Sequence, residues 1–142
     1  MSDKKIIIVG NAGVGKTNLI NRLLNKKFEN RYKETTQFNQ YKINNNITIY
    51  DTPGQLKYKI KKYFPKVKIT HCIIMFDVTS QMSYNSINFW AELLMKIYGN
   101  IKFLIIGNKI DDSKYRKVYK LNANISVKDN KNIKEIREQI II

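Results

Sequence analysis

The stretch "IIIVGNAGVGKTNL", residues 6–19, decides the fold. It begins with four apolar residues, which are typical of a buried strand, and continues with glycines at 10, 13 and 15 before a helix-like segment. Glycine adopts backbone angles that a Cβ opposes, so successive N–H groups can turn inward toward phosphate oxygens. The pattern Gly-x4-Gly-Lys-Thr at 10–17 is the phosphate-binding P-loop pattern, and it lies in the strand–loop–helix context that it requires.

The composition is that of a globular domain rather than a fibrous or membrane-spanning chain. Of the 142 residues, 43% are apolar and 26% are charged, which suits one domain over the whole chain. No apolar run approaches the roughly 18 residues of a membrane span, and no stretch resembles a secretory signal. We therefore expect a cytosolic or nuclear protein, with its single cysteine, Cys72, buried in an apolar run.

The net charge of +15 leaves two explanations open. A chain rich in Lys, Asn and Ile is typical of an AT-rich genome, whereas a basic surface also steers acidic partners or nucleic acid toward a protein. The densest basic stretch, "KYKIKKYFPKVK" at residues 57–68, alternates lysines with aromatic residues. These aromatics can stack on bases or fill the core side of an amphipathic segment, so nucleic-acid binding is not predicted.

Apolar runs alternate with amphipathic stretches along the chain. Because the central runs are continuous rather than alternating in polarity, they indicate parallel strands that are covered on both faces. The asparagines at 44–46 predict a tight antiparallel hairpin at one edge. We therefore expect an α/β three-layer sandwich of the P-loop NTPase type, with a mostly parallel sheet of five to six strands. The expected strands are Lys5–Val9, Tyr41–Ile43, Ile47–Tyr50, His71–Phe76, Ile101–Ile106 and a last one near Val118–Asn122; the expected helices are Lys16–Asn25, Ser83–Tyr98 and Asn132–Ile141.

The P-loop pattern assigns roles to its last residues. Lys16 would reach the β- and γ-phosphates of a nucleotide, and the Thr17 hydroxyl would bind Mg²⁺. The start of the helix adds a favourable dipole for the anion. The residues expected to surround the phosphates are Asn11, Ala12, Gly13, Val14, Gly15, Lys16, Thr17 and Asn18.

A second motif, "IYDTPGQ" at residues 49–55, places an Asp at the end of a strand and Thr-x-Gly directly after it. Asp51 can hold Mg²⁺ through a water molecule, and Gly54 can offer its N–H to a γ-phosphate because no side chain stands in the way. Gln55 would then orient an attacking water. With a P-loop upstream in the same sheet, the motif predicts hydrolysis of a nucleoside triphosphate.

A third motif, "IIGNKIDD" at residues 105–112, indicates which base the site binds. A carboxylate at Asp111 can accept from N1–H and the 2-amino group of guanine, a pair of donors that adenine lacks. Lys109 would lie along the base and the P-loop, next to Asn108 at the end of the same strand. A further tripeptide before the last helix is placed to offer a backbone N–H to the guanine carbonyl, and its residues are Ser126, Val127 and Lys128.

These motifs, in this order, resemble those of the Ras-superfamily small GTPases over nearly the whole chain. The resemblance implies one G domain over residues 1–142, with GTP or GDP and Mg²⁺ as cofactors. It also implies a first switch region in which Phe28 packs on the guanine, Tyr32 lies nearby, and Thr35, rather than its neighbour Thr36, closes on Mg²⁺. The catalytic residues implied are Gln55, Lys16 and Thr35, and the metal ligands are Thr17, Thr35 and Asp51.

Within the superfamily, "IIMFDVTS" at residues 73–80 and "RKV" at 116–118 look most similar to the Ran branch. That likeness implies a role in nuclear transport, transport receptors among the effectors and regulators, and a location in the nucleus and cytoplasm, which could be those of a host cell. The chain has no C-terminal cysteine, so no lipid anchor is expected. We expect a monomer.

The sequence also departs from the family pattern. The hairpin at 44–46 is short, and the segment between Asp111 and Ser126 has little room for the helix that the family carries there. Pro53 stiffens the second switch, and Leu56 replaces the usual Glu. No arginine is evident as an internal transition-state finger, so slow intrinsic hydrolysis is expected. Two alternatives stay open, namely a non-catalytic guanine-nucleotide-binding module and a Rab-like trafficking GTPase.

Overall fold

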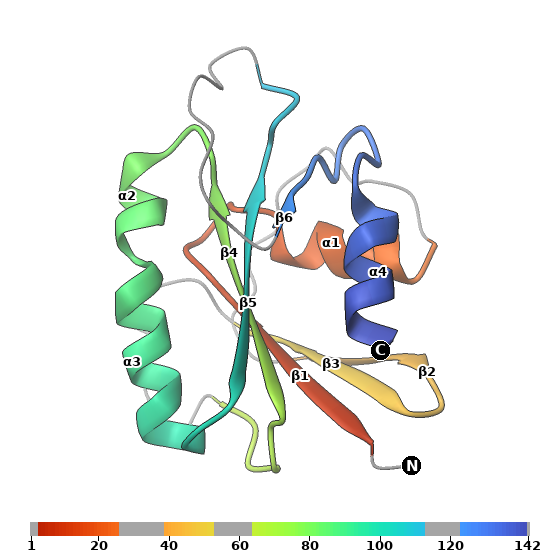
Figure 1. Cartoon of the computed structure of the whole chain (residues 1–142), viewed down its shortest axis with the longest axis vertical. Helices are drawn as coiled ribbons and strands as arrows, with labels where there is room; N and C mark the ends of the chain where they lie inside the picture. The colour runs from red at the N-terminus through yellow and green to blue at the C-terminus, as the bar shows by residue number, and fades with distance from the viewer. Residues whose placement is uncertain (1–2, 26–38, 53–63, 113–122, 142) are drawn as a thin grey trace.

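The computed structural model describes residues 3–25, 39–52, 64–112 and 123–141. Within these ranges, strands alternate with helices along most of the chain, which confirms the predicted α/β class (Figure 1). In chain order the elements are β1 (Lys4–Val9), α1 (Lys16–Leu23), β2 (Asn39–Asn44), β3 (Ile47–Asp51), β4 (His71–Asp77), α2 (Gln81–Asn85), α3 (Ile87–Tyr98), β5 (Lys102–Asn108), β6 (Ala123–Asn124) and α4 (Ile133–Ile141).

The strands form one sheet in the order β2-β3-β1-β4-β5-β6. Neighbouring strands pair in parallel, except that β2 and β3 are antiparallel. Asn45 and Asn46 make the turn between this last pair, and the Asn44 side chain accepts from the N–H of Asn46 at 2.8 Å. The predicted parallel sheet with one antiparallel edge hairpin is therefore confirmed.

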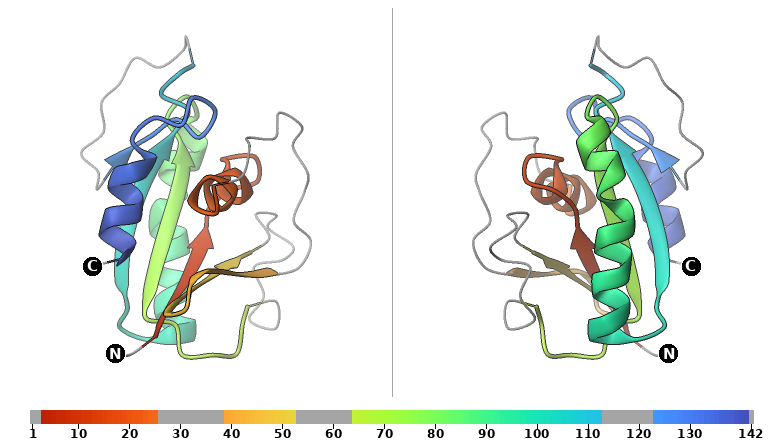
Figure 2. Two further views of the ribbon diagram at one scale, coloured as in Figure 1. Left: turned by 90° about the vertical axis from the view of Figure 1, so that its right-hand side faces the viewer. Right: turned by 90° about the vertical axis from the view of Figure 1, so that its left-hand side faces the viewer.

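Helices cover both faces of the sheet, as Figure 2 shows, with α1 and α4 on one face and α2 and α3 on the other. Side chains along β1 alternate between the two faces. Ile8 packs in one core cluster with Leu19 of α1 and Ile136 of α4, whereas Ile7 packs in the other with Trp90 of α3. All five are at most 1% exposed, and each such side chain contributes roughly 1.5–3 kcal/mol of burial. The three-layer sandwich follows from this two-sided burial.

Two helices differ from the sequence prediction. The helix expected over 83–98 is divided into α2 and α3, which meet at Ser86. The Ser86 hydroxyl donates to the Met82 carbonyl at 3.0 Å, and bonds of this kind compete with regular helix. The helix expected over 16–25 ends at Leu23, because Asn25 adopts a left-handed conformation with φ 62° that ends the helix.

At the far edge of the sheet, the last strand is β6 (Ala123–Asn124) rather than the predicted strand near 118–122, whose residues lie outside the described ranges. Residues 113–122, where one helix of the family is predicted to be absent, also lie outside the described ranges. Among the described helices, none has both the length and the apolar character that a membrane crossing requires.

Candidate nucleotide-binding site

The three sequence motifs follow strands that end at the same edge of the sheet. β1 leads into the P-loop (residues 10–15), β3 ends at Asp51 and β5 ends at Asn108. The strand register aligns these ends, since Ile8 pairs with Asp51, and Asp77 of β4 pairs with Asn108. In open α/β sheets, ligands bind outside this edge. The topology therefore brings the predicted phosphate, metal and base residues together.

Two glycines of the P-loop are required by the close approach of other groups. A Cβ on Gly10 would lie 2.3 Å from the carbonyl oxygen of Met75, and one on Gly15 would lie 2.3 Å from Nδ2 of Asn108. Gly15 also has φ 106°, which L-residues with side chains rarely adopt. The loop thus packs against the ends of β4 and β5 with no room for side chains at these two positions.

Lys16 begins α1 and is only 7% exposed. Its ammonium group donates to the carbonyl oxygens of Gly10 at 2.9 Å and Asn11 at 3.0 Å. The side chain therefore folds back over its own loop and places a positive charge beside the backbone that the pattern assigns to phosphate binding. The other predicted phosphate-binding residues of the loop, from Ala12 to Val14, lie between Asn11 and Gly15. Asn18 lies in the first turn of α1.

Thr17 and Asp51 come together from different elements. The Thr17 hydroxyl donates to Oδ2 of Asp51 at 2.5 Å, and the Asp51 side chain is only 1% exposed. A hydroxyl and a carboxylate are hard oxygen ligands of the kind that Mg²⁺ prefers. The two groups adjoin the P-loop at the helix start, so the residues present fit a magnesium ion held beside the phosphates. Among the described residues, no cluster of three or more His, Cys, Asp or Glu forms a second metal site.

Asn108 connects the phosphate part of the site to the base loop (residues 126–128). Its Nδ2 donates to the Val14 carbonyl at 2.9 Å, and its Oδ1 accepts from the N–H of Val127 at 3.1 Å. The side chain is only 1% exposed, where a lost hydrogen bond costs about 1–3 kcal/mol. The N–H of Val127 is therefore engaged with Asn108 rather than directed at a ligand.

The two segments predicted to bind the base also contact each other. The hydroxyl of Ser126, which is fully buried, donates to Oδ1 of Asp111 at 2.6 Å and accepts from the N–H of Asp129 at 2.9 Å. Ser126 also pairs with Lys131 in an antiparallel bridge, which gives the base loop a backbone support. Lys128 is exposed at the end of the tripeptide.

Lys109 has an acidic partner that the sequence analysis does not predict. Its Nζ lies 3.0 Å from Oδ2 of Asp77, and the backbone of Lys109 is left-handed with φ 72°. Burial of Asp77 alone would raise its pKa, but hydrogen bonds from Thr79 and the Lys109 ammonium outweigh this, and the pKa lies below its ordinary value. In the sequence, the only indication of this ion pair is an acidic residue directly after a predicted strand.

A second connection absent from the prediction ties the P-loop to α3. The Trp90 indole N–H donates to Oδ1 of Asn11 at 3.1 Å, and Nδ2 of Asn11 donates to the Ser86 hydroxyl at 3.1 Å. Trp90 is thus both a buried core residue and a support for the loop. The five remaining predicted site residues lie outside the described ranges, and they are Phe28, Tyr32, Thr35, Gly54 and Gln55.

The chain is similar to proteins named Rab7. Ras-related protein Rab7 of Pisum sativum is 35% identical over 121 residues, an alignment that covers 75% of this chain and 58% of the relative. Ras-related protein Rab-7a of Dictyostelium discoideum is 29% identical over 131 residues, covering 84% of this chain and 64% of the relative. The chain therefore spans less than two thirds of the length of these relatives.

These names correct two expectations. The relatives are named Rab7 and not Ran, so the expected Ran branch is unsupported, and the predicted location in the nucleus and cytoplasm is wrong. The stretch that suggests Ran, residues 73–80, forms most of β4, and Ile73, Ile74, Met75 and Phe76 are at most 2% exposed. Such residues report how the sheet packs rather than which partner the protein binds.

The sequence model described as "Ras family" matches residues 5–140 of this chain. Ras-family small GTPases bind GTP or GDP together with Mg²⁺, which suits the P-loop, the Thr17–Asp51 pair and the base motif described above. The match covers all the described strands and helices apart from their outermost residues. The chain belongs to the Ras family of small GTPases.

Proposed function

We propose that this chain is a Rab-like guanine-nucleotide switch, which binds GTP with Mg²⁺ and hydrolyses it slowly to GDP. The observation that carries the proposal is the position of Asn108. Its buried side chain bonds to Val14 in the P-loop and to Val127 in the base loop, so one residue joins the phosphate and base parts of the site. A module that bound only phosphate would not need this connection.

The residues would divide the work as follows. Lys16 would bind the β- and γ-phosphates through the ammonium that now lies on the loop carbonyls of Gly10 and Asn11. Thr17 and Asp51 would hold Mg²⁺, which when bound neutralises charge on phosphate oxygens. Asp111 would accept from the guanine base, with its carboxylate supported by the Ser126 hydroxyl.

The remaining roles rest on the sequence motifs and the family resemblance. Gln55 would orient the attacking water, and Gly54 would contact the γ-phosphate. Thr35 would close on the metal. The guanine would pack on Phe28, with Tyr32 nearby. The similarity to Rab7 supports trafficking rather than nuclear transport as the process in which the switch acts. Its partners would then be effectors and regulators that read the switch segments.

Identification of the bound nucleotide tests the proposal directly. The freshly purified protein is denatured and the released nucleotide is separated by chromatography. We expect GDP, because a slow GTPase retains its product. Intact GTP, or no nucleotide, would contradict turnover or tight binding and would favour a non-catalytic module. Binding of Rab7 effectors to the GTP-loaded protein but not to the GDP-loaded protein would test the trafficking assignment.

Removal of Mg²⁺ is expected to speed GDP release by at least about tenfold, because the negative charge of the phosphates is then balanced by protein groups alone. Asp51→Asn is expected to release GDP rapidly even in Mg²⁺ and to respond to chelation by less than about twofold, because both changes remove the same interaction. A fluorescent GDP analogue measures both rates. Asp3→Asn serves as the charge control, because Asp3 is exposed and lies just before the start of β1, whose other end leads into the P-loop. Equal responses of Asp51→Asn and the wild type to chelation would remove Asp51 from the metal site.

Gln55→Leu is expected to lower intrinsic GTP hydrolysis by about tenfold while leaving GTP affinity unchanged, because the attacking water loses its orientation but the phosphates keep their ligands. Single-turnover hydrolysis of bound GTP measures the effect. An unchanged hydrolysis rate in a variant that still binds GTP would contradict the proposed role of Gln55.

A further inference from the structure

We propose that Arg22 is a positioning residue for the base loop, which aims the N–H of Lys128 at the 6-oxo group of guanine. Arg22 lies in the last turn of α1, shortly after the P-loop and far in sequence from the base loop. No motif of the sequence singles it out. The inference rests on the proposed function, since it concerns the same nucleotide site.

The contacts of Arg22 hold two consecutive carbonyl groups. Its Nε donates to the Val127 carbonyl at 2.7 Å, and its Nη2 donates to the Lys128 carbonyl at 2.8 Å. A guanidinium group is planar and presents its donors in a fixed fork, so two bonds from one group set the orientation of both peptides. The base loop is thus held by a side chain from an element 105 residues away.

The geometry of the peptide bond fixes where the N–H of Lys128 points once Arg22 holds the Val127 carbonyl. In a trans peptide the C=O and the N–H point to opposite sides, and the described residues contain no cis bonds. Because the Val127 carbonyl points at Arg22, the N–H of Lys128 points away from it. The neighbouring N–H groups are used within the protein, by Asn108 at Val127 and by the Ser126 hydroxyl at Asp129. Lys128 is therefore the residue of this loop whose N–H we assign to the base.

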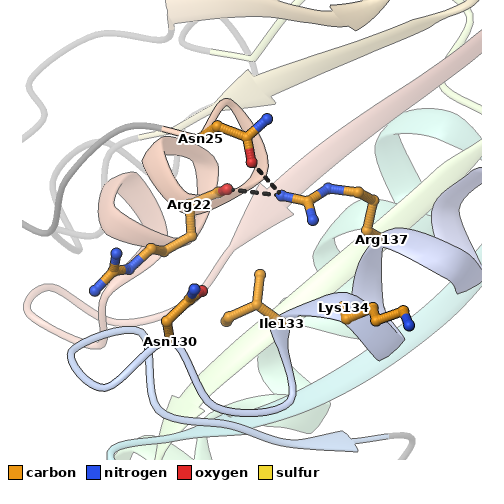
Figure 3. Close-up of a pocket in the computed structure, with 6 residues that line it drawn as sticks. All are labelled: Arg22, Asn25, Asn130, Ile133, Lys134 and Arg137. Carbon is orange, nitrogen blue, oxygen red and sulfur yellow. Dashed lines mark hydrogen bonds between the residues drawn. The ribbon is translucent and has the colours of Figure 1, made fainter.

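Arg137 of α4 supports the turn that carries Arg22. Its Nη2 donates to the Arg22 carbonyl at 2.8 Å and to Oδ1 of Asn25 at 3.2 Å, as the dashed lines in Figure 3 show. A cation at these carbonyls satisfies the open end of α1 and suits its dipole. Figure 3 also shows the guanidinium of Arg22 directed away from Arg137, so the two arginines act on opposite sides of the helix end.

A polar cavity lies beside these contacts. It has a volume of about 240 Å³ between the end of α1 and the start of α4. Its lining is polar except for one side chain, and consists of Arg22, Asn25, Asn130, Ile133, Lys134 and Arg137. Val127 of the base loop packs in the same core cluster as Leu19 and Leu23 of α1, and the fork of Arg22 adds the hydrogen bonds that orient the carbonyls of Val127 and Lys128.

The test compares GDP with two nucleotides whose bases are altered at the edge that the site contacts. The diphosphate of 2-aminopurine riboside lacks the 6-oxo group and, with it, the N1–H that Asp111 would accept, and IDP lacks the 2-amino group. The lost N1–H weakens binding of the 2-aminopurine nucleotide in every variant alike, so a change in preference between variants measures the 6-oxo contact. Their affinities are measured by competition with fluorescent GDP for the wild type, Arg22→Gln and Arg22→Lys. Lys134→Gln is the matched control, because it removes a positive charge from the same cavity without a hydrogen bond to the base loop.

For Arg22→Gln we expect the preference for GDP over the 2-aminopurine nucleotide to fall about tenfold, the worth of one hydrogen bond, while the preference for GDP over IDP is retained. Arg22→Lys keeps the charge but not the fork, so an intermediate loss is expected, and it decides the matter if Arg22→Gln does not fold. Lys134→Gln should match the wild type.

Uniform weakening of all three nucleotides in both Arg22 variants would overturn the inference, because a merely structural role predicts that result. Failure of the proposed function is a different outcome, namely a wild-type protein with no preference for GDP over ADP.

Discussion

Asp111→Asn is expected to change the base preference of the site from guanine to xanthine nucleotides. Guanine presents N1–H and a 2-amino group to the Asp111 carboxylate, two donors facing an acceptor. An asparagine amide instead accepts from N1–H and donates to the 2-oxo group of xanthine. A polar site left unpaired by the wrong ligand can discriminate by on the order of 10⁴, so we expect the ratio of XDP to GDP affinity to rise by about that factor.

Competition of GDP and XDP with a fluorescent nucleotide measures this ratio in Mg²⁺. Asp129→Asn is the matched control, since it makes the same chemical change at an exposed residue one position beyond the base loop. It should leave the ratio as in the wild type. The Ser126 hydroxyl that now donates to Asp111 can donate equally to the amide oxygen of an asparagine, so local structure is expected to survive. A variant that still prefers GDP would remove Asp111 from base recognition.

Gly15→Ala is expected to destabilise the protein strongly. The added Cβ would lie 2.3 Å from Nδ2 of Asn108 and would break the bond from that atom to the Val14 carbonyl. The backbone angle at Gly15, φ 106°, adds strain for any L side chain. Together, strain and a lost buried hydrogen bond should lower the free energy of unfolding by about 3 kcal/mol.

Urea unfolding in excess GDP and Mg²⁺ measures the change as a shift of the midpoint at constant slope. Gly13→Ala separates the two causes. Gly13 has a similar left-handed angle, φ 80°, but a Cβ there would meet nothing within 4 Å. It should therefore cost only the strain, about 1 kcal/mol. Equal destabilisation by the two substitutions would show that contact with Asn108 contributes nothing.

The larger part of the fold could be predicted because the signals are local. The continuous apolar runs at 6–9 and 71–76 specify buried strands through their composition alone, and the structure places them in β1 and β4. The glycines of residues 10–15 specify the loop because backbone angles depend on the residue itself. The hairpin at 44–46 follows from turn residues between two strands. By contrast, the break at Ser86 depends on a side-chain bond that composition does not reveal.

The residues that suggested the Ran branch could not establish to which branch of the family the chain belongs. The stretch at 73–80 forms most of a buried strand, where different branches meet the same packing requirement. Partner choice depends on surface residues, so a likeness carried largely by a buried strand could indicate the family but not the process in which the protein acts.

The sequence by itself determined which residues have the chemistry for phosphate, metal and base, since Lys16, Thr17, Asp51 and Asp111 are each marked by a contiguous motif. Only the tertiary structure decided how these motifs are held together. Asn108 reaches Val14 across 94 residues, Trp90 reaches Asn11 across 79, and Arg22 reaches the base loop across 105. The physical reason is that a motif encodes the angles and polarity of its own segment. The partner of a side chain depends instead on which strands become neighbours, and the order β2-β3-β1-β4-β5-β6 is a property of the whole chain.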